Sequence, residues 1–525
     1  MTRPPLVVVG DALLDRDLDG RAERLAPDAP VPVVDDPAER RRPGGAALAA
    51  TLAATLDRRA VVLVTALADD EPAAVLRGLL ELAGVEVVDL GLEGQTPEKI
   101  RVRAEGRSLL RLDRATRPGR VGPLDRSGRR ALAGAVAVLV ADYGRGVAAE
   151  PGVRAALAAL PSRRPLVWDP HPRGPAPVPG ARLATPNRAE AAGFVPEVPG
   201  TGLAAVTARA RLLADRWAAA GVAVTLGPGG ALLIEGAGAP LVVPAPAITG
   251  GDPCGAGDRF SAAAAGLLAD GALPSVAVAG AVAAATAFVA TGGAATVHLG
   301  PGAPTSLHPT PGDPGTPHRP GPGAPHPPGT GTPHPDSPAS GPPVGERSPA
   351  PAGAVPAVHR PPADPSPHAD SPLGRALRVI AAVRATGGTV VATGGCFDLL
   401  HAGHVATLRA ARALGDCLVV CLNSDDSVRR LKGPERPLVP QADRVAVLEA
   451  LGCVDVVVPF DERTPEAVLQ RLRPDVFAKG GDYALADLPE AELLATWGGQ
   501  AVVLPYLEGR STTQLMKEVV RRDSH

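Results

Sequence analysis

The chain contains few aromatic residues and few cysteines, and neither sign of charge is in excess. Phe, Trp and Tyr make up 2% of its 525 residues, and 53 Lys and Arg against 55 Asp and Glu give a net charge of −2. Without a basic excess, the protein has no global field that favours nucleic acid or an anionic membrane as a partner. The five cysteines are an odd number and form no C-x-x-C pair, a pattern typical of reduced thiols in the cytoplasm.

Long hydrophobic runs are also missing. The longest Ala-rich stretch, Ser275–Ala290, contains small residues and threonine, so we expect a buried helix there rather than a membrane span. Residues Met1–Gly10 lack the extended apolar region of a signal peptide. We therefore expect a cytoplasmic protein without a membrane partner.

Proline, in contrast, is abundant and concentrated in one segment. Residues 301–370 hold 23 of the 60 prolines and 6 of the 11 histidines, and they include no Phe, Tyr or Trp. Such a segment cannot bury enough apolar surface to offset the entropy lost on ordering, and its histidines are too widely spaced for a preformed metal site. We predict a disordered linker over residues 301–371 that joins two domains, 1–300 and 372–525.

Elsewhere, short apolar stretches alternate with Ala-, Leu- and Arg-rich helical patterns. This alternation predicts α/β architecture in both domains, with functional residues at the carboxyl ends of the strands. The clearest predicted strands of the first domain are Val61–Thr65, Ala137–Ala141, Leu166–Trp168 and Val222–Leu226.

The second domain contains the most informative stretch, Gly394–His404. A predicted strand, Thr389–Thr393, runs into a glycine turn and then into a helix that opens with His401 and His404. Residues three apart lie on one face of a helix, here beside the N–H groups and the positive dipole end that favour a phosphate. The alternatives are a metal site or two surface histidines, although no Cys pair or carboxylate lies at zinc-ligand spacing nearby.

This pattern resembles the H-x-G-H signature of nucleotidyltransferases. A second strand, Cys417–Leu422, follows the helix, so the segment reads as a parallel crossover unit. Later motifs include Arg430-Leu431-Lys432-Gly433, Asp443-Arg444, Lys479-Gly480-Gly481-Asp482-Tyr483 and Gly509-Arg510-Ser511-Thr512-Thr513. Their order is similar to the adenylyltransferase half of the bifunctional heptose 7-phosphate kinase/heptose 1-phosphate adenylyltransferases, over residues 372–520.

The resemblance implies roles for individual residues of the second domain. His401 and His404 would stabilise charge on the α-phosphate of ATP and on the leaving pyrophosphate. Lys432 would be a catalytic cationic clamp, and solvated surface charge is the alternative for any such lysine. The implied nucleotide-binding residues are Phe397, Lys479, Ser511, Thr512 and Thr513.

The first domain has its own phosphate motif, Gly250–Asp258. Without bulky side chains, the amides of Gly255, Ala256 and Gly257 can approach a transferring phosphoryl group at a helix N-terminus. Asp258 can accept the proton of an attacking sugar hydroxyl. A chance G-A-G-D in so Gly- and Ala-rich a chain is the alternative.

The motif resembles the D-T-x-G-A-G-D signature of ribokinase-like sugar kinases, and residues 5–297 resemble the heptose kinase half. Pro253, Cys254 and Arg259 depart from the signature, and Leu48 replaces the usual Asn. Lys99–Arg101 and Arg111–Asp113 would belong to lid strands. The implied sugar-binding residues are Asp11, Asp15, Gly44, Gly45 and Arg111; the implied nucleotide-binding residues are Asn187, Thr225 and Gly227, with Glu190 as a Mg²⁺ ligand.

The resemblance implies a ribokinase-like α/β domain with a small β lid, followed by a Rossmann-like nucleotidyltransferase domain. The expected protein is a cytoplasmic bifunctional enzyme that uses Mg²⁺ and ATP, takes sugar phosphates as substrates and forms a homodimer through its kinase domain. Two alternatives stay open. One is a kinase/nucleotidyltransferase for another sugar or polyol phosphate; the other is an active adenylyltransferase attached to a degenerate kinase scaffold, which Leu48 and Arg259 motivate.

Overall fold

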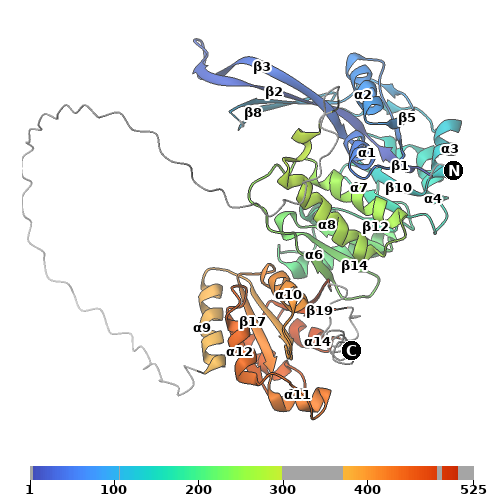
Figure 1. The fold of residues 1–525 in the computed structure, drawn as a ribbon. Helices are drawn as coiled ribbons and strands as arrows, with labels where there is room; N and C mark the ends of the chain where they lie inside the picture. Colours follow the sequence, from blue (N-terminus) through green and yellow to red (C-terminus); the bar gives the residue numbers. More distant parts are fainter. Residues whose placement is uncertain (1–3, 106, 298, 300–370, 482–487, 506–525) are drawn as a thin grey trace, which may run out of the picture. The chain divides into compact units, whose positions relative to one another are not determined.

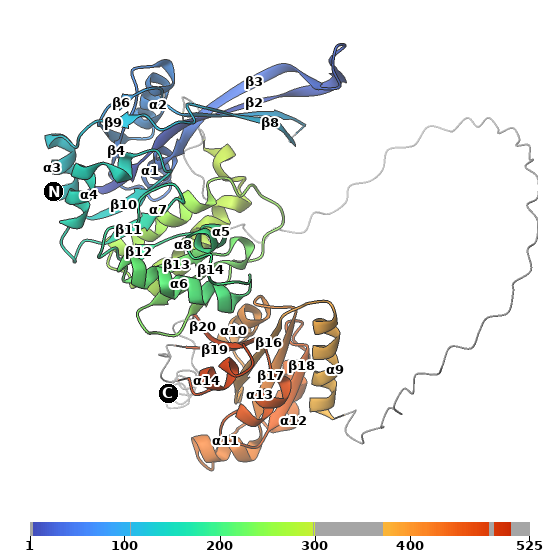
Figure 2. The same ribbon diagram turned by 180° about the vertical axis from the view of Figure 1, so that it is seen from behind.

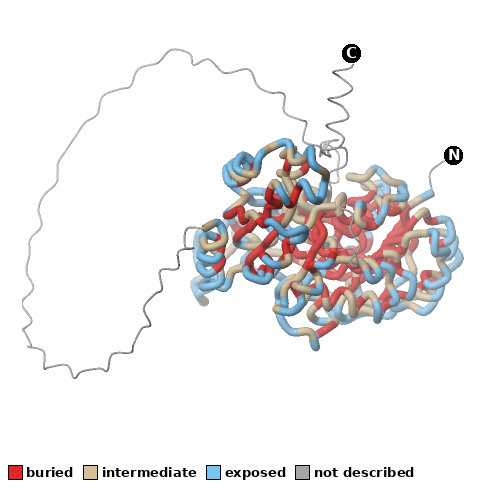
Figure 3. Tube along the Cα trace, turned by 90° about the horizontal axis from the view of Figure 1, so that it is seen from below, coloured by how far each residue is buried: buried red, intermediate tan, exposed pale blue. Residues whose placement is uncertain are grey.

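The computed structural model describes residues 4–105, 107–297, 299, 371–481 and 488–505 (Figure 1). The predicted linker, apart from Ser371, and the predicted phosphate-binding residues Ser511, Thr512 and Thr513 lie outside these residues. Within the described ranges, no helix combines the length and the hydropathy that crossing a bilayer requires. Figure 3 shows buried residues in the interior of the described parts and exposed ones at the rim.

The first domain is built on strands that are buried on both faces. The strand order is β15-β14-β13-β12-β11-β10-β1-β4-β5, parallel from β13 through β5, with β14 and β15 antiparallel to their neighbours. Continuous apolar runs such as Leu-Val-Val-Val-Gly in β1 explain why this part of the sheet is covered on both sides. The bounds are β1 Leu6–Gly10, β4 Val61–Thr65, β5 Val85–Asp89, β10 Ala137–Ala141, β11 Leu166–Asp169, β12 Leu183–Ala184, β13 Gly221–Thr225, β14 Ala231–Glu235 and β15 Leu241–Val243.

Alternate residues of β1 point into different hydrophobic cores. Leu6 and Val8 belong to a core shared with α1, α2, α7 and α8, whereas Val7 and Val9 join a core shared with α3 and α4. Helices therefore cover both faces of the sheet. Their bounds are α1 Ala46–Thr55, α2 Glu71–Leu82, α3 Arg126–Gly134, α4 Pro151–Ala158, α5 Arg188–Phe194, α6 Leu203–Trp217, α7 Ala256–Ala269 and α8 Pro274–Ala290.

The predicted lid strands form a separate mixed sheet, with both parallel and antiparallel pairs, that projects from the domain (Figure 1). Its order is β3-β2-β7-β8, and every residue of β8 is exposed. Strands β6 and β9 pair with each other and form a separate two-stranded sheet. The bounds are β2 Ala12–Leu25, β3 Pro32–Gly45, β6 Leu92–Glu93, β7 Glu98–Ala104, β8 Arg107–Arg114 and β9 Arg120–Val121.

The second domain has a parallel sheet of order β18-β17-β16-β19-β20 (Figure 2). Helices α9 and α13 pack on one face and α10 and α12 on the other. Because the chain moves outward from β16 in one direction and then from β19 in the other, the topological switch point lies between these two strands. The bounds are α9 Pro372–Ala385, β16 Val390–Gly395, α10 Ala402–Arg412, β17 Cys417–Asn423, α11 Asp425–Lys432, α12 Gln441–Glu449, β18 Val456–Phe460, α13 Glu466–Leu472, β19 Val476–Gly480, α14 Glu490–Ala495 and β20 Gln500–Leu504.

Three local predictions need correction. The glycines predicted as a turn after Thr393 are the last residues of β16, because they pair with β17. His401 is the N-cap of α10, so the helix begins one residue later than the pattern suggested. Helix α8, predicted to be buried, is buried on one face only, and Val276 is 55% exposed.

A buried arginine connects the loops at the switch point. The side chain of Arg444 is 1% exposed. Its guanidinium donates to the carbonyls of Val439, Cys396 and Asn423 at 3.0, 2.6 and 2.8 Å, and to the carboxylate of Asp425 at 2.7 Å. A single buried cation therefore satisfies acceptors after β16, after β17 and before α12.

We expect Arg444→Met to lower the free energy of unfolding of the second domain by about 3–5 kcal/mol, because it leaves a carboxylate and three carbonyls without their donor. Arg375→Met is the matched control: its pair with Glu449 is half-exposed, so its loss should cost about 1 kcal/mol or less. Thermal unfolding of the full chain measures both. Equal effects of the two variants would contradict the role given to Arg444.

Candidate active sites

The anion hole predicted in the first domain is the start of α7. Gly255 is its N-cap with φ of +79°, a left-handed conformation that favours glycine. A Cβ at this position would also lie 3.0 Å from Leu48 Cδ2. The amides of Gly255, Ala256 and Gly257 thus open a helix of 14 residues, whose dipole adds to their attraction for phosphate.

Asp258 lies in the first turn of α7 and is 8% exposed. Its Oδ1 accepts a hydrogen bond of 2.6 Å from Tyr143 Oη. Burial raises the pKa of Asp258 to about 6, and the bond from Tyr143 and the charge of Lys99 oppose that rise. A carboxylate in this state is ionised at neutral pH and still basic enough to accept a proton.

The two predicted sugar-binding carboxylates have different surroundings. Asp11 follows β1 and accepts from the amides of Tyr143, Arg145 and Val147 at 2.9–3.1 Å, so it fixes the loop after β10. Asp15, on the lid strand β2, accepts from Arg101 at 2.9 Å. The structure therefore gives Asp11 a role in shaping the site, and direct sugar contact by either carboxylate stays a prediction.

The glycine pair before α1 keeps the chain close to this lid strand. A Cβ at Gly44 would lie 2.6 Å from Asp15 Oδ2, and Gly45, the N-cap of α1, has φ of +61°. Arg111 lies opposite Arg101 in the pairing of β7 with β8 and forms an ion pair with Asp113 at 2.7 Å. It is half-exposed, so any contact with sugar remains a prediction.

The predicted nucleotide loop is a capping box. Asn187 caps α5 by accepting from the amide of Glu190, whose side chain accepts in return from the Asn187 amide. Asn187 also forms an isolated bridge with Thr225, which ends β13. Gly227 follows with φ of +62°. Three predicted nucleotide-binding residues thus lie on neighbouring strand ends.

Two carboxylates near this loop, those of Glu190 and Asp169, could supply part of the ligand set of a magnesium ion. Glu190 has a pKa raised by burial, and Asp169, which the sequence reasoning missed, is a partly exposed carboxylate whose pKa is raised by desolvation and by the charges of Asp258 and Glu190. The described residues contain no group of three or more metal-ligating side chains. Mg²⁺ binds through one or two carboxylates plus substrate phosphates and water, so Glu190 and Asp169 would hold it together with ATP.

Two of the four departures from the kinase pattern, Arg259 and Leu48, have structural explanations. Arg259 forms two hydrogen bonds of 2.7 Å with Asp57 at the end of α1, so its guanidinium is held by that carboxylate. Leu48 packs in an apolar cluster with Leu52 and Phe288. It presents a methyl group to the Gly255 turn, where the resemblance implies a polar contact.

In the second domain, the two histidines are fixed at the N-terminus of α10. His401 Nδ1 accepts from the amide of Gly403 at 3.1 Å, and His404 Nδ1 accepts from the amide of His401 at 3.3 Å. The ring centroids are 3.9 Å apart. When neutral, each ring therefore carries its proton on Nε2 and can donate it to a phosphate oxygen.

His404 is held neutral. Burial lowers its pKa to about 4, and the neighbouring charges of His401 and Lys432 act in the same direction. Lys432 ends α11, so this catalytic candidate lies within electrostatic reach of the histidines. Phe397, with φ of +45°, places its ring 5.4 Å from that of His404.

Two further carboxylates, Asp398 and Glu490, bind residues of the loops in this domain. Asp398 accepts from the amides of Leu438 and Val439 at 2.7 and 3.0 Å and pairs with Arg436, which anchors the loop between α11 and α12. Lys479, at the end of β19, has its ammonium 3.4 Å from the carboxylate of Glu490. The sequence reasoning identified Lys479 but neither of these carboxylates.

A model of the pfkB family carbohydrate kinases matches residues 4–299, and a cytidylyltransferase-like model matches residues 392–504. "Bifunctional protein HldE" of Streptomyces coelicolor is 54% identical over 98% of this chain and 96% of its own length. The HldE protein of Azorhizobium caulinodans is 36% identical over 98% and 97%. The chain belongs to the bifunctional HldE family.

The HldE assignment confirms the family and the two α/β domains that the motifs predicted. The solved ribokinase of Arabidopsis thaliana, in complex with ribose and ATP, covers 55% of this chain and 93% of its own, with 22% identity and a TM-score of 0.43.

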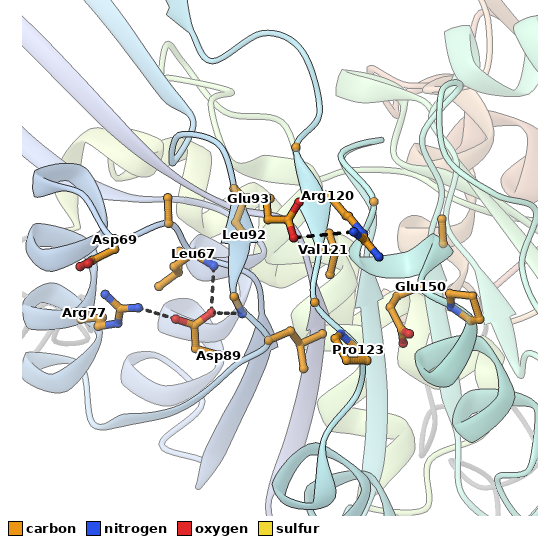
Figure 4. Close-up of a pocket in the computed structure, with 18 residues that line it drawn as sticks. Leu67, Asp69, Arg77, Asp89, Leu92, Glu93, Arg120, Val121, Pro123 and Glu150 are labelled. Atoms are coloured by element: carbon orange, nitrogen blue, oxygen red, sulfur yellow. Dashed lines mark hydrogen bonds and ion pairs between the residues drawn. The ribbon is translucent and has the colours of Figure 1, made fainter.

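A large hollow in the HldE kinase domain lies apart from these residues. It has a volume of about 1010 Å³ and lies among the loops after β4 and β5, the β6-β9 pair and the start of α4 (Figure 4). Four of its charged side chains form ion pairs, Arg77 with Asp89 and Arg120 with Glu93, and Asp69 and Glu150 also line it. None of the predicted site residues lines it.

We expect Asp258→Asn to reduce sugar phosphorylation by about 10²–10⁴-fold, because the variant cannot accept the hydroxyl proton. In the wild type, turnover should fall as the pH drops below about 6, where Asp258 becomes protonated. Initial rates between pH 5 and 8 measure this. Asp125→Asn, which keeps the cap of α3, should behave as wild type; kinase turnover in Asp258→Asn within a few-fold of wild type would contradict the role of base.

We expect His404→Ala to reduce nucleotide transfer by about 10²–10³-fold, since one preorganised donor to the transferring phosphate is lost. Kinase activity and the melting temperature of the first domain should not change. Arg409→Ala, on the exposed part of the same helix, is the matched control. The metal alternative makes a different prediction: stoichiometric zinc in the purified chain, lost on His404→Ala, would contradict the nucleotide-binding role.

Proposed function

We propose that this HldE protein makes ADP-heptose through two of its own reactions. The first domain phosphorylates heptose 7-phosphate at O1 with Mg-ATP, and the second transfers AMP from ATP to heptose 1-phosphate with release of pyrophosphate. A separate phosphatase must remove the 7-phosphate between the two steps. The observation that carries the proposal is the presence in one chain of a buried carboxylate beside the N-terminus of α7, and of two histidines at the N-terminus of α10 whose Nδ1 atoms accept backbone amides.

In the kinase reaction, Asp258 accepts the proton of the O1 hydroxyl as that oxygen attacks the γ-phosphorus of ATP. The amides of Gly255, Ala256 and Gly257 hold the phosphoryl oxygens as charge shifts toward ADP. Bound magnesium would neutralise charge on the phosphates. Asn187, Thr225 and Gly227 are the proposed nucleotide contacts, since they lie on adjoining strand ends.

In the second reaction, a phosphate oxygen of heptose 1-phosphate attacks the α-phosphorus of ATP. That oxygen is already ionised, so no general base is required. The Nε2–H groups of His401 and His404 donate to the α-phosphate and the leaving pyrophosphate, and Lys432 and Lys479 add positive charge. No covalent enzyme intermediate is needed.

We further propose a homodimer formed through the lid, in the cytoplasm. Within the described residues, strand β8 is an edge of the lid sheet, and it has the exposed apolar residues Leu109, Leu110 and Leu112. An exposed edge with apolar side chains is a template for pairing with a second copy. Charged residues alternate along the same strand, which would fix the register of that pairing.

The full-length protein should convert heptose 7-phosphate, ATP and magnesium into heptose 1,7-bisphosphate, and into ADP-heptose when a phosphatase is added. Mass spectrometry follows both products. Asp258→Asn should stop the first product only, and His404→Ala only the second when heptose 1-phosphate is supplied. Phosphorylation of another sugar phosphate in preference to heptose would overturn the substrate assignment, and an inactive kinase beside an active transferase would favour the scaffold alternative.

A further inference from the structure

Tyr143 is the direct partner of the proposed base, although the sequence predicted no role for it beyond a place in a strand-end loop. It follows β10 by two residues, and its hydroxyl donates to Asp258 Oδ1 at 2.6 Å. The two residues are 115 positions apart in the sequence. Burial, together with the charge of Asp258 and the bond to it, raises the pKa of Tyr143, so the phenol keeps its proton and acts as the donor.

The loop that carries Tyr143 is held rigidly in place. Asp11 accepts from its amide and from two later amides of the loop. Gly144 has φ of +69°, and a Cβ there would lie 2.6 Å from His171 Nδ1. The backbone that carries Tyr143 is thus anchored to Asp11 after β1, and the turn at Gly144 lies close against His171.

The lid supplies the other contact of the ring. Lys99, on β7, places its ammonium 5.2 Å from the centre of the Tyr143 ring, within the range of a cation–π interaction. Its charge also acts on Asp258. The other charged groups that face the base are Asp15 from β2 and Asp169 from β11.

We propose that Tyr143 is a positioning residue of the kinase: it aims Asp258 by holding Oδ1, and it favours the ionised carboxylate, so that Oδ2 receives the proton of the sugar hydroxyl. The O1–H bond breaks as the O1–phosphorus bond forms, the proton goes to Oδ2, and ADP leaves with the electron pair of the broken phosphoanhydride bond. This inference rests on the proposed kinase activity.

The lid takes part in the same arrangement. Because Lys99 contacts the Tyr143 ring from β7, a displacement of the lid would remove both this contact and a positive charge near the base. The base would then be harder to ionise, because its remaining charged neighbours Asp15 and Asp169 are acidic. Tyr143 thus links the position of the lid to the ionisation of Asp258.

Tyr143→Phe provides the kinetic test. Removing a donor to the ionised form raises the pKa of Asp258, so the acidic limb of the kcat/KM profile should move upward by about one pH unit. The loss of activity should approach about tenfold near pH 5, be about fivefold at pH 6, and nearly disappear above pH 8. A reduced rate with an unmoved midpoint, or an unchanged rate, would overturn the proposal.

Thr51→Val is the matched control, because it removes a buried hydroxyl of the same domain, bonded at 2.8 Å to the carbonyl of Ala47 within α1. It should leave the midpoint of the pH profile unchanged, and an equal shift in this variant would also overturn the proposal. Melting temperature and nucleotide transfer in the second domain monitor the fold of each variant.

A second measurement does not depend on catalysis or on the stability of Tyr143→Phe. Of the three tyrosines in the chain, Tyr143 alone precedes residue 300, so uniform 3-fluorotyrosine labelling places a single probe in the kinase domain. Its ¹⁹F signal should titrate with a midpoint near 6, the value to which burial raises the pKa of Asp258, and this titration should vanish in Asp258→Asn. A titrating signal without heptose phosphorylation would refute the function alone; a signal that does not titrate would refute the contact.

Discussion

Strands buried on both faces leave only their ends for polar chemistry, and this constraint organises both domains. In the first domain, β1 ends at Asp11, β10 at Asp142 and Tyr143, and β11 at Asp169. In the second, β16 leads to the H-x-G-H loop at the switch point and β19 ends beside Lys479. Because the interior of each sheet is apolar and nearly filled, charged groups from distant parts of the sequence collect at one edge.

The same constraint makes these charges costly for stability. Burial raises the pKa of Asp142 to about 7 and that of Asp258 to about 6, and Asp142 Oδ2 is buried without a hydrogen-bond partner within the described structure. A carboxyl whose pKa is raised on folding stabilises the fold at low pH, and that contribution is lost as the pH rises through the folded value. At neutral pH, the strand ends of the kinase domain therefore contain carboxylates whose ionised form is destabilised by burial, a combination typical of functional sites.

Features formed by residues that are contiguous in the sequence could be predicted from it. The two motifs and the strand alternation follow from local patterns, because glycine turns, helix starts and apolar runs are encoded within a few residues. The lid strands were expected only from the resemblance to sugar kinases. The Tyr143–Asp258 bond and the Arg259–Asp57 pair join residues 115 and 202 positions apart, so no local pattern reports them. Similarly, nothing around Arg444 predicts that its guanidinium is buried, since arginine is usually exposed. Gly394 was misplaced because a glycine pair predicts a turn unless its strand partner is known.

The two sites solve related problems differently, and the difference follows from the attacking group. Each begins where a strand leads into a helix, so that N–H groups and the helix dipole face a phosphate. A sugar hydroxyl must lose its proton during attack, which requires a base that is ionised yet not too weak; the buried Asp258, stabilised by Tyr143 and Lys99, meets this requirement. A sugar phosphate is already ionised, so a base would add nothing, whereas a cationic or neutral donor reduces repulsion between two phosphates. Neutral His404 accepts the amide of His401 at Nδ1 and so carries its proton on Nε2; this is the arrangement that the role proposed for it in the second reaction, donation to a phosphate, requires.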